Sequence, residues 1–364
     1  MKNTAVMLED FERINSFSFI EWEKFRDQTI LVTGATGLIG MSFVKAVLHV
    51  SRKQGLKIRV IALFRNLKKA EECFCDECGD ANLVFMQSDV RELPAIEGKV
   101  DYIVHCASVT ASKYMVTNPT ETLLITVEGT KNILELAKNA NVKGVVYLSS
   151  MEMYGYTEET QNPVTEEKLG YINILNVRSC YPEGKRAAEC LCHAYAREYG
   201  VPVSIARLAQ TFGAGVGAGE TRVFAYFAKS ALRHEDIVLH TKGQSVGNYC
   251  YTADVVSALL CLLTKGSHGE AYNVANEQNS MRICEMADLV CREVSGGTSK
   301  IVFDIPEDAL KYGYAQDTNL RLSAEKLRGL GWFPQYALGE MYQRMIKSWN
   351  EAGETEFGFI RFRM

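Results

Sequence analysis

Short apolar runs alternate along most of the chain with longer segments in which apolar residues recur at helical spacing. The helical segments cover 41–52, 120–140 and 182–199. The runs are rich in β-branched residues and read QTILVTG, KIRVIALF, NLVFMQSDV, VDYIVHCAS, GVVYLSS and PVSIARLA. Continuous apolar strands are typical of parallel sheets that helices cover on both faces. The pattern therefore predicts an α/β fold with a doubly wound parallel sheet.

The same pattern divides the chain. After Gly213 the segments become shorter and more irregular, although EAYNVANE has the character of a further strand. We expect the irregular segments to form a smaller C-terminal, substrate-binding lobe over the carboxyl ends of the strands, where ligands of doubly wound sheets bind. The expected parts are an N-terminal helical extension (1–27), the sheet domain (28–213, with 251–276 returning to it), the smaller lobe (214–250 and 277–345) and a C-terminal tail (346–364).

Composition, charge and the length of the apolar segments argue against several classes of protein. Of 364 residues, 47% are hydrophobic and 23% charged, which is ordinary for a globular chain with a large core. The formal net charge is −4 and no long Lys/Arg run occurs, so nucleic acid is not an expected partner. The N-terminus lacks the pattern of a secretory signal, and the longest apolar segment, 255–264, is too short to span a bilayer. We expect a cytoplasmic protein without membrane contact.

The cysteines raise the question of a metal site. Three of the eleven cluster in CFCDEC as Cys73, Cys75 and Cys78. Thiolates at such spacing can bind zinc, but structural zinc sites take four protein ligands and no fourth is evident nearby. We predict reduced thiols on a surface excursion between two strands, and no metal.

The turn after the first apolar run, TGATGLIG, carries three glycines. A tight strand-to-helix turn, the approach of a pyrophosphate to backbone N–H groups, and close helix–strand packing each require a residue without Cβ. A nucleotide-hydrolase loop would continue with Gly-Lys-Ser/Thr, but Met41 follows here. The turn therefore predicts a Rossmann-type dinucleotide site that includes Gly34, Thr36, Gly37, Leu38, Ile39 and Gly40.

The end of the second run bears on which dinucleotide binds. An acid there would bind the ribose 2′-hydroxyl of NAD, but the sequence has Phe64 and Arg65. Arg65 can pair with a 2′-phosphate, which favours NADP slightly over NAD. The alternative is a surface arginine that stacks on adenine without selecting the phosphate.

A candidate reactive cluster follows. Tyr181 stands four residues before Lys185, so both lie on one face of a helix. A phenol is a weak acid at neutral pH, and a nearby ammonium would lower its pKa, making Tyr181 an acid or base for alcohol–ketone chemistry. Ser150, at the end of the fifth run, could bond the same substrate oxygen.

The segments TGATGLIG, VHCAS, LSSMEMYG and CYPEGK, in this order, resemble the extended short-chain dehydrogenase/reductase family. The resemblance is to its NAD(P)-dependent epimerase/dehydratase branch, which acts mostly on nucleotide sugars, and runs from about Thr29 to about Trp332. It implies catalytic roles for Ser150, Tyr181 and Lys185. It also implies cofactor contacts from Asp89, Val90, Ala107, Ser108, Tyr181 and Lys185. The local sequence most resembles that of UDP-glucuronate decarboxylases. The segments that carry this resemblance are KYMVTNP, Arg178 with SCYPEGKRAAE, and Glu152.

Three positions depart from the family pattern. Met151 replaces the aspartic acid of 4,6-dehydratases and cannot move a proton. Gln210 stands where the family usually has asparagine, and is expected to contact substrate. Gly247 occupies the place of an arginine that grips the substrate diphosphate, which removes a charge-assisted contact. Arg222, which we assign to substrate binding, or Arg233 could compensate.

Other polar groups near these motifs are weighed separately. Glu152 lies between two methionines at a strand end, and we interpret it as a second acid or base beside the reacting carbon rather than a solvated carboxylate. His105, Cys106 and Cys180 are interpreted as core residues.

Together these features predict an NAD(P)-dependent enzyme that modifies a nucleotide sugar by hydride transfer at sugar C4. If the hydride returns, the enzyme is an epimerase, dehydratase or decarboxylase. If it does not, the enzyme is an NADPH-dependent reductase of a keto-sugar or small ketone. A non-catalytic NADP-binding regulator is a further alternative, although the chain keeps Tyr181 and Lys185. The resemblance also implies a homodimer through 120–140 and 182–199.

Overall fold

The structure, a computed structural model, describes residues 1–306 and 317–353. Its centre is a seven-stranded sheet in the order β10-β6-β5-β4-β1-β2-β3, with every pair parallel. This confirms the predicted fold class. The strands are β1 (Thr29–Thr33), β2 (Arg59–Phe64), β3 (Leu83–Gln87), β4 (Tyr102–His105), β5 (Gly144–Ser150), β6 (Val203–Leu208) and β10 (Ala271–Val274).

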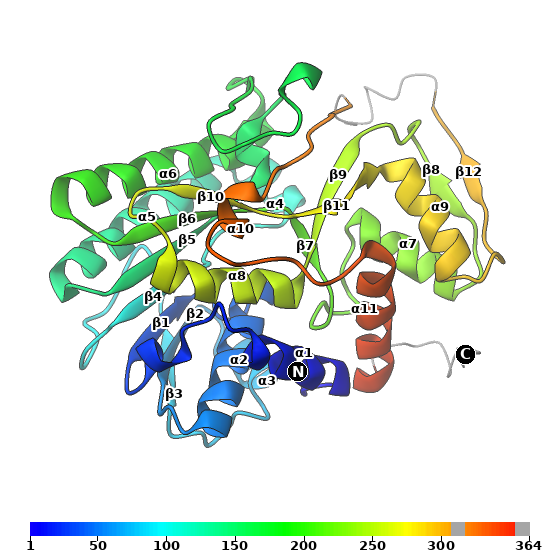
Figure 1. The fold of residues 1–364 in the computed structure, drawn as a ribbon. Helices are drawn as coiled ribbons and strands as arrows, with labels where there is room; N and C mark the ends of the chain where they lie inside the picture. Colours follow the sequence, from blue (N-terminus) through cyan, green and yellow to red (C-terminus); the bar gives the residue numbers. More distant parts are fainter. Residues whose placement is uncertain (307–316, 354–364) are drawn as a thin grey trace.

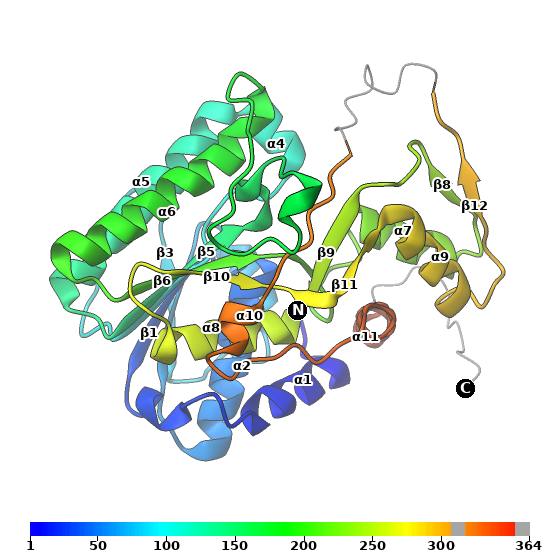
Figure 2. The ribbon, with the colours of Figure 1, turned by 45° about the horizontal axis from the view of Figure 1, so that its top comes forward.

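Helices cover both faces of this sheet (Figure 1). Alternate residues of a strand point to opposite faces, so Ile30 and Val32 of β1 join one apolar core and Leu31 joins the other. Figure 2 shows α5 and α6 side by side on one face and α2 and α8 on the other. The helices along the sheet are α2 (Leu38–Gln54), α3 (Leu67–Cys73), α4 (Ser112–Thr117), α5 (Pro119–Ala140), α6 (Cys180–Tyr199) and α8 (Thr252–Lys265).

The smaller lobe lies beside the sheet, at the right of Figure 1. A three-stranded sheet, β11-β9-β7, and a two-stranded parallel pair, β12-β8, form it with helices α7 and α9. Its elements are β7 (Gln210–Phe212), α7 (Val223–Leu232), β8 (Ile237–Leu239), β9 (Val246–Tyr251), β11 (Asn276–Arg282), α9 (Ile283–Glu293) and β12 (Ile301–Phe303). Because β7 follows β6 after one residue, the lobe starts directly at the carboxyl edge of the main sheet.

Two later segments do not stay in the smaller lobe. The short helix α10 (Glu325–Arg328) lies against β10, and Trp332 donates from its indole to the Asp254 carbonyl of α8 at 3.1 Å. Helix α11 (Leu338–Ala352) then crosses the boundary that we expected at 345/346. The predicted tail beyond residue 353 lies outside the described residues.

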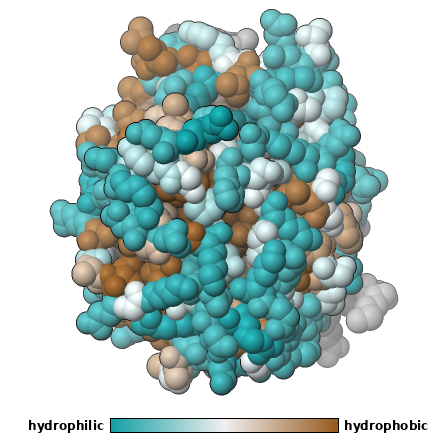
Figure 3. Space-filling view, turned by 60° about the vertical axis from the view of Figure 1, so that its left-hand side comes forward, coloured by the Kyte–Doolittle hydropathy of each residue, from teal (hydrophilic) through white to brown (hydrophobic). Residues whose placement is uncertain are grey.

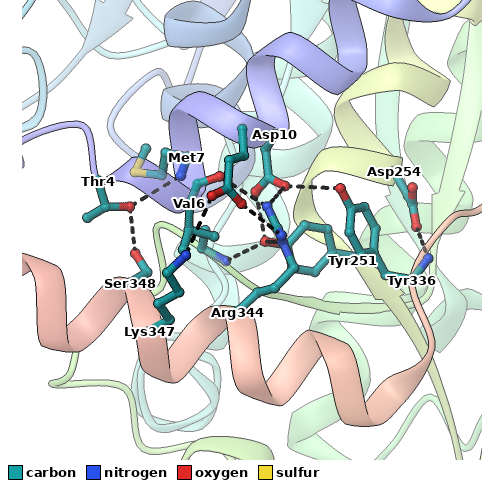
Figure 4. A network of polar contacts seen from close by, with 12 residues as sticks. Thr4, Val6, Met7, Asp10, Tyr251, Asp254, Tyr336, Arg344, Lys347 and Ser348 are labelled. Carbon is teal, nitrogen blue, oxygen red and sulfur yellow. Dashed lines mark hydrogen bonds and ion pairs between the residues drawn. The ribbon is translucent and has the colours of Figure 1, made fainter. Parts of the chain in front are cut away.

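The N-terminal extension is tied to α11. Helix α1 (Ala5–Ser16) is followed by a 3-10 turn, η1 (Trp22–Phe25). The buried carboxylate of Asp10 accepts hydrogen bonds from Arg344 at 2.7 Å, Tyr251 at 2.7 Å and Tyr336 at 3.2 Å, as Figure 4 shows. This network joins α1, α11 and the end of β9.

No helix in the ranges described has the length and apolar character that a membrane span requires.

Candidate active site

One cavity of about 670 Å³ follows the carboxyl ends of the central strands. Parallel strands end at a common edge, so residues from distant parts of the chain meet there. Apart from Arg233, which was the alternative to Arg222, the residues that the sequence predicted for cofactor, substrate or catalysis all line this cavity: Gly34, Thr36, Gly37, Leu38, Ile39, Gly40, Arg65, Asp89, Val90, Ala107, Ser108, Ser150, Glu152, Tyr181, Lys185, Gln210 and Arg222.

The three glycines of the first turn differ in what they contact. Gly34 has φ +62°, and a Cβ there would stand 2.8 Å from the Ala107 backbone nitrogen. A Cβ on Gly40 would stand 2.5 Å from the Gly34 carbonyl oxygen. Gly37, the N-cap of α2, is less crowded, because its Cβ would meet only that same oxygen, at 3.3 Å. Gly34 and Gly40 are thus needed for the tight turn and for close backbone packing. The absence of a side chain at Gly37 leaves room for a ligand in the cavity.

The residues around the turn fit a dinucleotide. The N-terminus of α2 presents backbone N–H groups at the cavity, where they can bind phosphate oxygens. The hydroxyl oxygens of Ser108 and Ser149 are buried in the lining and have no hydrogen-bond partner among the residues described. Buried hydroxyls are costly without a partner, so a ligand with polar groups suits this wall.

Tyr181 and Lys185 lie one turn apart at the start of α6 and are both buried. The Lys185 ammonium donates to the Leu148 carbonyl at 2.7 Å and lies 5.7 Å from the centre of the Tyr181 ring. Burial lowers the pKa of Lys185 to about 8. The ammonium is therefore directed at the end of β5, beside the tyrosine ring.

Burial has the largest effect on the pKa of the Tyr181 phenol. Burial raises its pKa to about 12, and Glu152 acts in the same direction. A hydrogen bond with Ser150 and the charge of Arg178 oppose the rise. The Lys185 ammonium donates to the Leu148 carbonyl and is not one of the main influences on this pKa, and the activation of Tyr181 by Lys185 stays a prediction.

Glu152 forms an ion pair that the sequence did not reveal. It follows β5 in a 3-10 turn, η2 (Met151–Tyr154), with its N–H bonded to Ser150 Oγ at 3.2 Å. Its Oε2 lies 2.9 Å from Nη2 of Arg178, which precedes α6 in the turn η4 (Val177–Ser179). The Glu152 side chain is still 46% exposed; partial desolvation raises its pKa, and Arg178 opposes the rise. The two residues are far apart in sequence, and no spacing rule connects them.

The far end of the cavity carries the residues expected to meet an adenosine. Arg65 is exposed and lies 4.0 Å from the Asp89 carboxylate, which Arg91 holds at 3.0 Å. Arg91, acting through its side-chain hydrogen bond, lowers the pKa of Asp89. Asn66 and Lys69, which come soon after the end of β2, also line the cavity, although the sequence analysis assigned neither to the cofactor.

Three groups were expected in the core. His105 is buried, with Nδ1 2.7 Å from the Thr33 hydroxyl, and burial lowers its pKa to about 3, which confirms its core role. Cys106 is half-buried and lines the cavity, and burial raises its pKa to about 12. Cys180 is also half-buried, with Sγ 3.4 Å from the Met115 carbonyl. Cys106 therefore lies at the site, whereas Cys180 does not line the cavity.

The CFCDEC segment begins at Cys73, the last residue of α3. Cys73 is buried, Cys75 and Cys78 are exposed, and the buried carboxylate of Glu77 lies 3.2 Å from the buried ammonium of Lys45. Within residues 1–306 and 317–353, no group of three or more His, Cys, Asp or Glu side chains is arranged to hold a metal ion.

Comparison with known proteins assigns the family. Residues 30–275 match the model of the NAD dependent epimerase/dehydratase family. The chain belongs to this family. It is 31% identical over 319 residues to UDP-glucuronic acid decarboxylase 1 of Xenopus tropicalis, covering 87% of this chain and 71% of the relative. It is 30% identical over 312 residues to UDP-glucuronic acid decarboxylase 6 of Arabidopsis thaliana, covering 85% of each. The predicted family is thereby confirmed.

Solved structures show the same fold. An epimerase from Methanothermobacter thermautotrophicus has a TM-score of 0.77 at 22% identity, covering 93% of this chain and 97% of that one. The UDP-glucuronic acid 4-epimerase from Bacillus cereus, solved with UDP-glucuronic acid and NAD, has a TM-score of 0.72 at 18% identity, covering 89% and 100%. The epimerase/dehydratase family is NAD-dependent, which agrees with the predicted nicotinamide cofactor.

The structure explains one departure from the family pattern. Gly247 is buried in β9 and is not part of the cavity lining, and a Cβ there would stand 2.4 Å from the hydroxyl oxygen of Tyr249. The tyrosine thus fills the space that a longer side chain at 247 would need. Of the two arginines proposed to compensate, Arg222 lines the cavity, whereas Arg233 does not and lies 3.9 Å from Glu235.

Proposed function

We propose that the protein uses NAD(P) to modify a nucleotide sugar through hydride transfer at sugar C4. The observation that carries the proposal is that one continuous cavity joins the glycine turn to the Ser150, Tyr181 and Lys185 cluster. Membership of the epimerase/dehydratase family and the names of the decarboxylase relatives support it.

Each side chain has a role in this proposal. Tyr181 exchanges the proton of the C4 hydroxyl, and Ser150, which bonds it, orients the reacting oxygen. Lys185, held by the Leu148 carbonyl, binds the nicotinamide ribose. The nicotinamide, when bound, supplies the hydride acceptor. Glu152 moves a proton at the adjacent carbon, and Gln210 and Arg222 bind the substrate from β7 and the N-cap of α7.

NADP is proposed over NAD as the preferred form. Arg65 and Lys69 both line the adenosine end of the cavity and would meet a 2′-phosphate. Asp89 weakens this preference, because its carboxylate already lies 4.0 Å from Arg65.

Within this proposal, a nucleotide-linked hexuronic acid is the substrate with the most specific support. The relatives named above are UDP-glucuronic acid decarboxylases. Met151 lines the cavity where 4,6-dehydratases have an acid, which disfavours dehydration. A second candidate, an NADPH-dependent reductase of a keto-sugar or small ketone, is favoured by Arg65 and by the lack of an arginine at Gly247. A non-catalytic NADP-binding regulator is the remaining alternative.

The test is a mass analysis of UDP-, CDP-, dTDP- and GDP-sugars, including UDP-glucuronic acid, incubated with the protein and NAD or NADP, with and without reduced cofactor. Loss of carbon dioxide, loss of water, or an unchanged mass at a new retention time would identify a decarboxylase, a dehydratase or an epimerase. Gain of two hydrogens with consumption of NADPH would identify the reductase. If every sugar is unchanged, the nucleotide-sugar proposal is wrong.

We also propose that the protein is a homodimer through α5 and α6. The face that carries these helices comes forward in Figure 3 and is mostly hydrophilic with separate hydrophobic areas. Leu123 and Leu124 of α5 and Tyr199 of α6 are exposed apolar side chains. Sedimentation of the wild type against Leu123→Glu/Leu124→Glu tests this. The proposal requires a dimer that the double substitution converts to monomer, and a monomeric wild type contradicts it.

A further inference from the structure

Arg178 is a charged group that lies beside both members of the proposed acid/base pair, Glu152 and Tyr181. Its Nη2 lies 3.1 Å from Oε1 and 2.9 Å from Oε2 of Glu152, so one nitrogen contacts both carboxylate oxygens. The guanidinium carbon lies 5.4 Å from the centre of the Tyr181 ring. One side chain thus contacts the carboxylate and stacks near the phenol ring.

The local backbone fixes this arrangement. Asn176 caps the turn η4 by accepting the N–H of Arg178 at 2.9 Å. The turn runs directly into α6, where Tyr181 is the second residue. In the turn η2, which carries the other partner, Ser150 Oγ accepts a hydrogen bond from the N–H of Glu152 at 3.2 Å. Both partners of the ion pair are therefore held by capped 3-10 turns rather than by free loops.

Arg178 has little else to neutralise its charge. Its Nη1 is buried and finds no hydrogen-bond partner in the part of the chain described. The other charged or titratable groups near this point are Tyr181 and Lys185 from α6, Arg222 from the N-cap of α7, and Arg186, which is bonded to the Met153 and Tyr154 carbonyls. Glu152 is the carboxylate that Arg178 pairs with.

We propose that Arg178 is a positioning residue, whose guanidinium holds Glu152 as an ionised proton acceptor beside the hydroxyl of Tyr181. The proposal deepens the proposed function and rests on it for the reaction that Glu152 serves. The side chains of Arg178 and Glu152 are 31% and 46% exposed, so the pair is only partly screened by water, and an opposite charge in direct contact favours the carboxylate. Arg178 does not line the cavity, so it acts through Glu152 rather than on the substrate.

The first test needs no substrate. Thermal unfolding is measured from pH 5 to pH 9 for the wild type, Arg178→Gln, Glu152→Gln and the double variant. We expect a coupling between the two positions at pH 8 that declines as Glu152 takes up a proton at low pH. The control is the pair Arg282–Glu285, whose Nη2 and Oε1 lie 2.6 Å apart and whose arginine is 46% exposed against 31% for Arg178, so it should show a smaller coupling. A cycle with no coupling at any pH would overturn the proposal.

The second test uses the sugar that is converted in the panel above. Removing an opposite charge in contact with a carboxylate changes its pKa by about 1–3 units, so Arg178→Gln should move the acidic limb of the kcat profile upward by about 1 pH unit or more. Arg178→Lys, which keeps the charge, should restore most of the original limb. A fall in kcat by the same factor at every pH would indicate a merely structural role and contradict the proposal. If no sugar is converted, the proposed function fails while the unfolding cycle still decides the ion pair.

Discussion

Gly40 lies so close to Gly34 that a Cβ on Gly40 would stand 2.5 Å from the Gly34 carbonyl oxygen. The contact is with backbone, which cannot move aside as a side chain can. Gly40→Ala should therefore lower the free energy of unfolding by about 1–3 kcal/mol, the usual cost of overpacking. Gly37→Ala, at an N-cap with φ −80°, should change stability little and instead weaken NAD binding, by about tenfold if the lost contacts are worth about 1.4 kcal/mol. Urea unfolding and NAD titration of both variants measure this contrast, and equal stability losses would contradict it.

Tyr181 is proposed to exchange the proton of the reacting hydroxyl. Tyr181→Phe keeps the ring and its packing, so the fold should survive, while kcat should fall by about 10²–10⁴-fold. Tyr171→Phe is the matched control, because Tyr171 is 67% exposed and lies outside the cavity lining. Turnover of the converted sugar is the measurement. An unchanged kcat in Tyr181→Phe would remove this residue from the chemistry and favour the regulator alternative.

Arg65 is proposed to select NADP. A hydrogen bond to a charged group is worth about 1.5–3 kcal/mol, so Arg65→Gln should weaken NADP binding by about 10–100-fold and leave NAD binding nearly unchanged. Arg59→Gln serves as control, because Arg59 begins the same strand at its other end. Calorimetric titration with both dinucleotides gives the ratio. Parallel losses for NAD and NADP would instead support an arginine that stacks on adenine.

Asp254 should make stability depend on pH. Burial raises its pKa to about 8, and Asp10 of the network in Figure 4 has its pKa raised to about 6, again mainly by burial. In both cases the folded state holds the proton more tightly than the unfolded chain. The stability from these groups is therefore full below about pH 4 and is lost as pH rises toward 8.

Asp254→Asn should flatten this dependence between pH 5 and pH 8. Asp288→Asn, at an exposed ion pair 3.0 Å from Arg292, should leave it as in the wild type. Urea unfolding across this range is the measurement. A wild-type stability that rises steadily with pH would show that other groups outweigh the two buried carboxyls.

Gly247 and Tyr249 occupy space together, since a Cβ on Gly247 would meet three ring or hydroxyl atoms of Tyr249 at 2.4–2.6 Å. Tyr249 is fully buried, and its hydroxyl has no hydrogen-bond partner among the residues described. Gly247→Ala should cost about 1–3 kcal/mol of stability. Tyr249→Phe should cost little, because it removes a buried hydroxyl that bonds nothing. A stable Gly247→Ala variant would show that the tyrosine can move and that an arginine could be accommodated.

Local pattern was sufficient for much of the site. The strand ends, the glycine turn and the Tyr181–Lys185 spacing are short-range features, and in a parallel sheet every strand end falls on one edge. That is why residues predicted one by one, from Gly34 to Arg222, line a common cavity. The sequence by itself therefore determined the sheet, the position of the cavity and the type of ligand that suits it.

Tertiary structure decided the contacts within that cavity. The Glu152–Arg178 pair, the bond from Lys185 to the Leu148 carbonyl and the packing of Tyr249 against Gly247 join residues that no helical or strand period relates. The same is true of the pKa of Tyr181, which burial raises although Lys185 stands four residues later on the same helix. Burial and orientation depend on how elements from distant parts of the chain pack, so the electrostatics of the site emerge only when the fold is complete.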